Sequence, residues 1–359
     1  MDYAPLAPGS VIGILGGGQL GRMLAVAGAE LGFDVHVYDP EPDCPASRVA
    51  TRAWSAPWSD TGAIQGFADR CDAITYEFEN VPVEAVAIAA RVSTLRPGAR
   101  SLELTQDRVV EKNFINEAGV GTVAFAPVSN LTELQEAIRL VGLPAVLKTR
   151  RFGYDGKGQA WIRTEADADT AWTTIGEQSA ILEAAAPFTR ELSVVAARSV
   201  DGRVKAYPLG ENVHRDGILK TTTAPAPNLS KQQETRALEI AKAIGSGLDH
   251  VGVFAVELFE LADGTLLVNE IAPRVHNTGH WTQDACACSQ FEQHMRAVAG
   301  WPLGDVTPSA SAVMENLIGD EVGDWAALAA EPAACLHLYG KRQTKPGRKM
   351  GHINRLGHL

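Results

Sequence analysis

Two glutamates, Glu257 and Glu270, lie in two apolar runs on either side of Asp263-Gly264. An Asp-Gly pair between apolar runs is a strong signal for a two-residue hairpin turn, and that turn would pair Ala262 with Thr265. The two glutamates then stand directly opposite each other, where like charges destabilise a sheet. Two interpretations are open: a solvated edge with two exposed acids, or two oxygen ligands for a divalent cation such as Mg²⁺, held together with substrate phosphates.

Further polar side chains, Arg274, His276, Asn277 and His280, follow directly after the second run. A cluster of this kind next to a pair of carboxylates indicates the floor of an active site. The elements that would position it begin much earlier in the chain.

A glycine-rich turn, Gly16 to Gly21, joins an expected strand at Val11–Leu15 to an expected helix, and Asp39 ends the next strand. This pattern is typical of dinucleotide binding, so an NAD-dependent oxidoreductase is one alternative. The same turn can hold any phosphate at a helix N-terminus. The oxidoreductase alternative leaves the glutamate pair unexplained.

Strand and helix patterns repeat to about residue 100 and predict one doubly wound domain. Glu77 and Glu79 lie at the end of the strand expected at Ala73–Phe78, where open α/β sheets bind ligands. Solvated loop acids are the other interpretation of this pair.

Basic residues and glycines follow in the middle of the chain. Arg108 and Lys112 share one face of an expected helix. A strand ending at Lys148 leads into a loop with three glycines and further cations, Gly153 to Gln159. Such a loop suits a flap over a polyphosphate, and a plain exposed hairpin tip is the alternative.

Two later segments also carry polar groups. Residues 211–227 show no regular period and contain His214, so we expect an irregular binding loop. A basic cluster from Lys341 to Lys349 surrounds a Pro346-Gly347 turn. It predicts an anion pocket, with a solvated turn as the alternative.

The composition limits the partners. A net charge of −11 argues against nucleic acid or an anionic membrane. The five cysteines are scattered and lack metal-site spacing, which favours reduced thiols. We expect a cytoplasmic protein, because the sequence shows neither a run of transmembrane length nor the regions of a signal peptide.

Six segments together resemble one family, the N5-carboxyaminoimidazole ribonucleotide synthetases, which are ATP-grasp enzymes of purine biosynthesis. They are GILGGGQLGRM, TYEFEN, FGYDGKGQ, HRDGILKTT, NEIAPRVHNTGHWT and KPGRKMGHIN. The resemblance implies an α/β protein with the ATP-grasp fold. It has an N-terminal doubly wound parallel-sheet domain (1–105), a central domain (106–300) with an α+β lid at about 125–187, and a small C-terminal domain (301–359).

The family's reaction joins bicarbonate to 5-aminoimidazole ribonucleotide at the expense of ATP, through carboxyphosphate. The resemblance therefore implies ATP and Mg²⁺ as cofactors, bicarbonate and the ribonucleotide as substrates, and a homodimer. Another ATP-grasp ligase, such as formate-dependent glycinamide ribonucleotide transformylase, is the nearer alternative. A non-catalytic nucleotide sensor is a third, although it would not need cations around two separate anions.

The resemblance also implies the site residues. For catalysis they are Asp155, Lys157, Arg274 and Asn277. For ATP they are Arg108, Lys148, Gly153, Tyr154, Asp155, Gly156, Lys157, Gly158, Gln159, Glu183, Ala184, Ala185, Ala186, Glu191, His214, Asn269 and Glu270. The ribonucleotide would contact Gln19, Leu20, Glu79, Lys341 and Arg348, and the metal Glu257 and Glu270.

Two departures from the pattern are visible. Ala272 stands where many ATP-grasp enzymes carry an asparagine, so this position supplies no side-chain metal ligand. The chain stops at Leu359, short of the C-terminal extension that we expect in this family.

Overall fold

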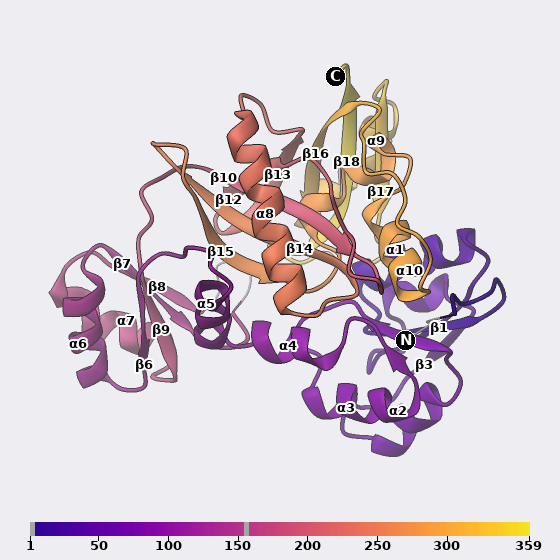
Figure 1. Cartoon of the computed structure of the whole chain (residues 1–359), viewed down its shortest axis with the longest axis horizontal. Coiled ribbons are helices and arrows are strands. Elements are labelled where there is room, and N and C mark those ends of the chain that lie inside the picture. Colours follow the sequence, from indigo (N-terminus) through magenta and orange to yellow (C-terminus); the bar gives the residue numbers. More distant parts are fainter. Residues whose placement is uncertain (1–3, 154–157) are drawn as a thin grey trace.

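The computed structural model describes residues 4–153 and 158–359. Four predicted site residues, Tyr154, Asp155, Gly156 and Lys157, lie outside the described residues. The described residues form three sheets, which Figure 1 shows as an N-terminal layer at lower right, a small layer at left and a large central sheet.

The N-terminal sheet is parallel, with strand order β3-β2-β1-β4-β5 and helices between the strands. Its strands are β1 (Val11–Leu15), β2 (Asp34–Tyr38), β3 (Arg52–Trp54), β4 (Ala73–Tyr76) and β5 (Thr94–Leu95). The helices are α1 (Gln19–Glu30), α2 (Thr61–Ala68), α3 (Val83–Val92) and α4 (Ala99–Thr105), with a short turn η1 (Pro45–Arg48). This is the doubly wound layer that the strand–helix repeat predicts.

Helix α5 (Arg108–Glu117) leads from this domain to the small sheet, which is antiparallel with order β6-β9-β7-β8. Its strands are β6 (Phe125–Val128), β7 (Ala145–Thr149), β8 (Gln159–Ile162) and β9 (Ala180–Ala184). Helices α6 (Leu131–Val141) and α7 (Ala168–Thr174) pack on it. Leu134, Ala137 and Ile138 form the buried stripe of α6 at the spacing of an amphipathic helix.

The large sheet runs β15-β14-β10-β12-β13-β16-β18-β17, and β11 pairs with β10. Its strands are β10 (Phe188–Arg198), β11 (Val204–Ala206), β12 (Gly210–Arg215), β13 (Ile218–Ala224), β14 (Gly252–Leu261), β15 (Leu266–Ala272), β16 (Ser311–Ile318), β17 (Ala334–Leu338) and β18 (Lys349–Gly357). Its helices and turns are α8 (Lys231–Gly247), η3 (Asn277–Gly279), α9 (Thr282–Ala285), α10 (Gln290–Val298), η4 (Gly319–Asp324) and α11 (Trp325–Ala329). The strands after residue 300 continue this sheet, so the C-terminal boundary stays a prediction.

Strand β14 is buried on both faces because its side chains alternate between two cores. Phe254 and Val256 pack in the core that contains α8, whereas Val253 and Ala255 pack with residues of α1 and α10. Glu257 shares the second face. The first carboxylate therefore stands at the end of a packed apolar row, which limits its movement.

The segment expected to be an irregular loop is instead the hairpin of β12 and β13. Its turn is Asp216-Gly217, with φ of 52° and 76°. Positive φ at both central residues is the requirement of a type I′ turn, which Asp-Gly satisfies. The expectation was wrong because the polar threonines of β13 obscured an alternation that the Asp-Gly pair could have revealed.

The turn between β14 and β15 also differs from the expected two-residue turn, although the expected pairing of Glu257 with Glu270 is present. The amide of Leu261 donates to Thr265 at 2.9 Å, so the loop has three residues, and Gly264 takes a φ of 83°. A bulge at Asn269 then shifts the register back by one residue, and Glu257 pairs with Glu270. The two shifts cancel.

Within residues 4–153 and 158–359, no helix is long and apolar enough to cross a membrane.

Candidate functional site

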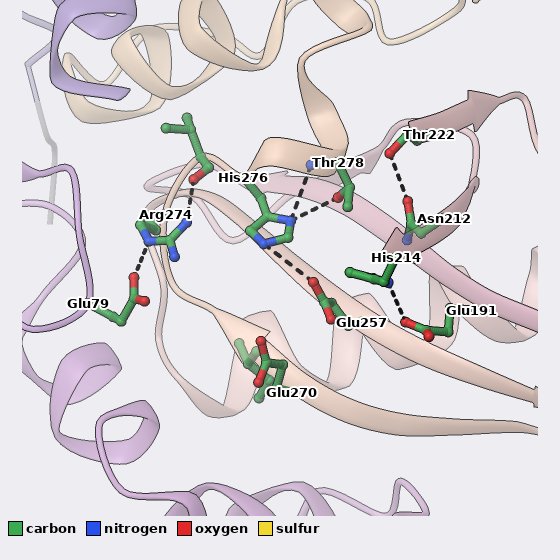
Figure 2. A network of polar contacts seen from close by, with 12 residues as sticks. Glu79, Glu191, Asn212, His214, Thr222, Glu257, Glu270, Arg274, His276 and Thr278 are labelled. Carbon is green, nitrogen blue, oxygen red and sulfur yellow. Dashed lines mark hydrogen bonds and ion pairs between the residues drawn. The ribbon is translucent and has the colours of Figure 1, made fainter. Parts of the chain in front are cut away.

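The opposed carboxylates lie in unequal surroundings. Arg108 Nη1 pairs with Glu270 at 3.0 Å. His276 Nε2 lies 3.4 Å from Glu257, as Figure 2 shows. Burial, and then the charge of Glu270, raises the pKa of Glu257 to about 7. Burial acts on Glu270 too, but Arg108 outweighs it and holds the pKa of Glu270 below its usual value.

His276 faces this pair as a neutral imidazole. Burial, and then Arg274, lowers the pKa of His276 to about 3. The backbone amide of Thr278 donates to His276 Nδ1 at 3.4 Å, so Nδ1 is the acceptor and the proton is on Nε2. His276 Nε2 therefore faces Glu257 at 3.4 Å without bringing a charge to it.

Cations gather around a third acid, Glu183, which is buried near the end of β9. Lys148 Nζ lies 2.8 Å from its carboxylate and Lys112 Nζ 3.5 Å. Burial opposes ionisation, but the two lysines bring the pKa of Glu183 to about 2. The structure thus brings together three predicted ATP residues, Lys148, Glu183 and Arg108, since Arg108 also contributes to that shift.

Glu191 and His214, each predicted to contact ATP, lie next to each other. His214 Nδ1 lies 2.8 Å from the Glu191 carboxylate across β10 and β12. Burial opposes the charge on His214, but the hydrogen bond to Glu191 raises the pKa of His214. Figure 2 shows this pair beside Glu257 on the same sheet.

Arg274 reaches across to the N-terminal domain and pairs with Glu79 (Figure 2). Burial disfavours the carboxylate, but Arg274 lowers the pKa of Glu79 to about 2. Close by in sequence, both amide atoms of Asn277 are buried without a hydrogen-bond partner among the described residues. Buried amide groups without a partner are costly, so this side chain is suited to a ligand.

The glycine turn holds the protein's own carboxylates. Glu77 accepts from the amides of Gly18 at 2.8 Å and Gly21 at 3.0 Å, and Asp39 accepts from Gly17 at 2.7 Å. A Cβ on Gly18 would lie 2.6 Å from Glu77. The donors that a dinucleotide pyrophosphate would need are therefore occupied. Gln19 and Leu20, predicted to bind the ribonucleotide, are the first residues of α1.

The basic C-terminal loop lies against the segment that follows this turn. Arg342 pairs with Asp43 at 2.7 Å, and Arg48 Nη1 donates to the carbonyl of Gly340 at 2.7 Å. Lys341 donates to the Lys349 carbonyl at 2.7 Å, and Arg348 to the Gln343 carbonyl at 3.0 Å. The loop of the two predicted phosphate ligands thus reaches the N-terminal domain.

The predicted flap, Gly153 to Gln159, is described only at its two ends, whereas the predicted adenine segment at the end of β9 is described in full. Arg108 Nη2 donates to the carbonyl of Gly153 at 3.3 Å, and the carbonyl of Gly158 accepts from Thr149 at 2.8 Å. Gln159 begins β8 opposite Lys148. The amides of Ala184 and Ala185 donate to the carbonyls of Ala124 and Pro144, both at distances of about 3 Å. Ala186 follows in the link to β10.

Two residues that the sequence did not assign to the site, Glu111 and Lys112, belong to its surroundings. His276, which the sequence placed in the active-site floor without a specific role, lies beside Glu257. Glu111 accepts from the backbone amide of Ile271 at 2.6 Å, and Lys112 donates to the carbonyl of Asn269 at 3.0 Å. Burial, and then Glu270, raises the pKa of Glu111 to about 8. The helical spacing of Arg108 and Lys112 was visible, but the strand edge that α5 covers was not.

Family models match nearly the whole chain. A ribonucleotide synthetase preATP-grasp domain matches residues 10–106, and an ATP-grasp domain matches residues 113–291. A phosphoribosylaminoimidazole carboxylase C-terminal domain matches residues 312–358. The last match favours the synthetase over the transformylase alternative.

Individual relatives agree. The N5-carboxyaminoimidazole ribonucleotide synthase of Brucella melitensis is 49% identical, over 99% of each chain. The Staphylococcus aureus synthetase in complex with ADP has a TM-score of 0.95 and 36% identity, and the match covers 100% of this chain and 96% of that one. The Aspergillus clavatus synthase with ADP and 5-aminoimidazole ribonucleotide has a TM-score of 0.92 and 30% identity, covering 98% and 94%.

Members of this group convert 5-aminoimidazole ribonucleotide to N5-carboxyaminoimidazole ribonucleotide with ATP, forming ADP and phosphate. The chain belongs to the N5-carboxyaminoimidazole ribonucleotide synthase family of ATP-grasp ligases.

Proposed function

We propose that this enzyme activates bicarbonate as carboxyphosphate beside Glu257 and Glu270, and passes the carboxyl group to the amine of 5-aminoimidazole ribonucleotide. The observation that carries this proposal is the opposed carboxylate pair, with Arg108 on one member and a neutral His276 on the other. Lys148 at the base of the flap would bind the ATP phosphates, and ATP, bicarbonate and the acid pair would then share one site.

The residues present fit a magnesium ion. Burial and Glu270 raise the pKa of Glu257 to about 7, so a nearby cation would relieve an unfavourable charge. Asn269 Oδ1 is buried without a partner among the described residues, on the strand that carries Glu270. Carboxylate oxygens together with substrate phosphates are the usual ligands of Mg²⁺. When bound, Mg²⁺ would offset charge on the phosphoryl oxygens.

The chemistry proceeds in two transfers. A bicarbonate oxygen attacks the γ-phosphorus and ADP leaves, which turns a poor electrophile into a mixed anhydride. The amine nitrogen then attacks the carboxyl carbon, phosphate leaves, and the nitrogen loses a proton. Arg274 and Asn277 would hold the bicarbonate-derived group, because one supplies charge and the other a buried amide without an internal partner.

Several roles rest on the family resemblance. Glu183 to Ala186 would border adenine and Glu191 the ribose, with His214 near the phosphates. Gly153, Tyr154, Gly156, Gly158 and Gln159 would form the flap, in which Asp155 and Lys157 orient the aminoimidazole. Closing the flap would keep water from the anhydride.

The ribonucleotide phosphate would bind between the two terminal parts of the chain. Lys341 and Arg348 would supply charge, and Gln19 and Leu20 would face them from the start of α1, with Glu79 nearby. The contacts of Arg48 with Gly340 and of Arg342 with Asp43 support this placement. We further propose a cytoplasmic homodimer, which light scattering of the purified protein would test.

Isotope transfer tests the proposal. With ¹⁸O-bicarbonate, ATP, Mg²⁺ and the ribonucleotide, one bicarbonate oxygen should appear in the released phosphate, since that oxygen stays on phosphorus when the anhydride is consumed. The Glu270→Gln variant supplies the background. Product formation with no ¹⁸O in the phosphate would exclude carboxyphosphate.

A further inference from the structure

The strand that carries Glu270 lies at the edge of the large sheet. β15 pairs only with β14 among the described strands, and on its outer side the amide of Val268 donates to the carbonyl of Gly121 at 2.9 Å, which leaves the stretch around Glu270 for other partners. An uncovered edge leaves backbone amides and carbonyls without partners and lets the strand shift. The bulge at Asn269 adds a further irregularity next to Glu270. Something must therefore fix this short stretch if Glu270 is to hold one orientation.

Helix α5 supplies that constraint through two consecutive charged residues. Glu111 accepts from the amide of Ile271 at 2.6 Å, and Lys112 Nζ donates to the carbonyl of Asn269 at 3.0 Å. These two backbone groups flank Glu270. In a strand, the amide and carbonyl of alternate residues point to the same side, so both face the open edge while Glu270 pairs with β14.

Both side chains are buried, with 3% of Glu111 and 1% of Lys112 exposed. Burying two ionisable side chains is expensive unless each is bound to a partner. Hydrophobic side chains would cover the edge at lower cost but would leave the two backbone groups without partners. Glu111 and Lys112 are thus suited to fixing the strand on both sides of one residue, because one accepts from its backbone and the other donates to it.

We propose that Glu111 and Lys112 are positioning residues that orient Glu270, and through it the metal, by closing the edge of β15. This inference rests on the proposed role of Glu270 as a metal ligand. Groups that orient metal ligands typically change metal affinity or activity roughly 10–100-fold when they are replaced. Glu111 is the cleaner probe, because Lys112 also lies 3.5 Å from Glu183.

Mn²⁺ binding in the presence of ADP, followed by electron paramagnetic resonance, measures this effect without turnover. Glu111→Leu should weaken Mn²⁺ binding roughly 10–100-fold, because Leu cannot accept from Ile271. Glu111→Gln should bind Mn²⁺ close to wild type, since its amide oxygen still accepts. ADP affinity in EDTA should be unchanged in both. Glu117→Leu, on the exposed end of the same helix, is the matched control.

Glu111→Asp keeps the carboxyl group but shortens the side chain, and it tests the inference if the Leu variant does not fold. It should weaken Mn²⁺ binding about tenfold, at the low end of the range for such groups. If Glu111→Asp and any folded Glu111→Leu bind Mn²⁺ like wild type while Glu270→Gln does not, the inference is overturned and the proposed function stands. If Glu111→Gln is as weak as Glu111→Asp, positioning by this hydrogen bond is also overturned. If Glu270→Gln keeps full Mn²⁺ affinity, the metal assignment falls, and this inference with it.

Discussion

Glu257 lies directly opposite Glu270 across β14 and β15, and of the two only Glu270 has an ion pair with an arginine among the described residues, to Arg108 at 3.0 Å. Glu257 instead faces His276, whose pKa of about 3 keeps it neutral. Two half-buried acids therefore share one arginine at ion-pair distance among the described residues. This imbalance is the physical basis for expecting a divalent ion at the pair.

Replacing Glu270 by Gln should abolish turnover and leave the fold intact. The change relieves repulsion with Glu257 but removes a metal ligand, so the loss should exceed the roughly 10–100-fold typical of groups that only orient such ligands. Steady-state rates at several Mg²⁺ concentrations, with circular dichroism for folding, measure it. Glu234→Gln on the exposed side of α8 is the control. A near-normal kcat at ordinary Mg²⁺ would refute the metal assignment.

The protein should bind adenine nucleotides at the ATP-grasp site and should not bind NADH at the glycine turn. ADP with Mg²⁺ at 100 times its Kd should add roughly 2.7 kcal/mol to the free energy of unfolding and raise Tm. NADH should leave Tm unchanged, because Glu77 and Asp39 occupy the amides of Gly17, Gly18 and Gly21. Thermal melts with each ligand decide between them. A shift with NADH and none with ADP would support the oxidoreductase alternative.

Arg348→Ala should weaken binding of the ribonucleotide much more than that of the dephosphorylated nucleoside. Arg348 is partly exposed here, and a bound phosphate would cover it; truncating one partner of such a covered charged hydrogen bond costs about 2–5 kcal/mol. At about 1.4 kcal/mol per decade, this is roughly 30-fold or more in affinity. Arg348→Lys should recover only part, since the paired N–H donors are lost. Lys345→Ala, exposed in the same loop, should change neither affinity. Equal losses for nucleotide and nucleoside would show that Arg348 does not contact the phosphate.

The junction between the first two domains should weaken in acid. His294 accepts from Val253 and contacts Thr75 of β4, and His250 contacts Ser101 of α4. Burial lowers the pKa of each histidine from 6.5 to about 3. Between these values the unfolded chain binds more protons, so the free energy of unfolding falls as pH falls below 6.5.

Each histidine should account for about 1.4 kcal/mol of stability lost between pH 7.5 and 5.5. Urea unfolding of wild type and of His294→Gln at both values measures this. The variant should be less stable at pH 7.5 but lose less on acidification, because one protonation step is gone. An unchanged difference between the two pH values would contradict the neutral state of His294.

Local sequence signals predicted much of this arrangement. Such signals extend over only a few residues, so they predict only what neighbouring residues determine. The glycine turn, the parallel N-terminal layer and the opposed glutamates follow from patterns a few residues long. The predicted pairing of Glu257 with Glu270 is correct only because two shifts in register cancel. The longer turn shifts the pairing by one residue, and the bulge at Asn269 shifts it back. A pairing rule cannot detect two cancelling shifts.

What the sequence did not reveal depends on contacts between distant segments. Glu111 meets Ile271 across 160 positions, and Glu77 meets Gly18 across 59. Nothing near Glu111 in the sequence indicates that it covers a strand edge. Nothing near Glu77 indicates that its carboxylate accepts from the glycine-turn amides that could otherwise bind a phosphate. Such roles follow from tertiary packing. The family resemblance indicated roles only for residues within its motifs, and it indicated none for Glu111.

The most direct test of the account is phosphate release from ATP with Mg²⁺, with bicarbonate and 5-aminoimidazole ribonucleotide each omitted in turn. We expect full release only when both are present, because the acid pair, the cations and the ribonucleotide pocket must be filled together for carboxyl transfer. The same dependence should vanish in Glu270→Gln. Full phosphate release without bicarbonate, or release driven by formate and another ribonucleotide, would contradict the account.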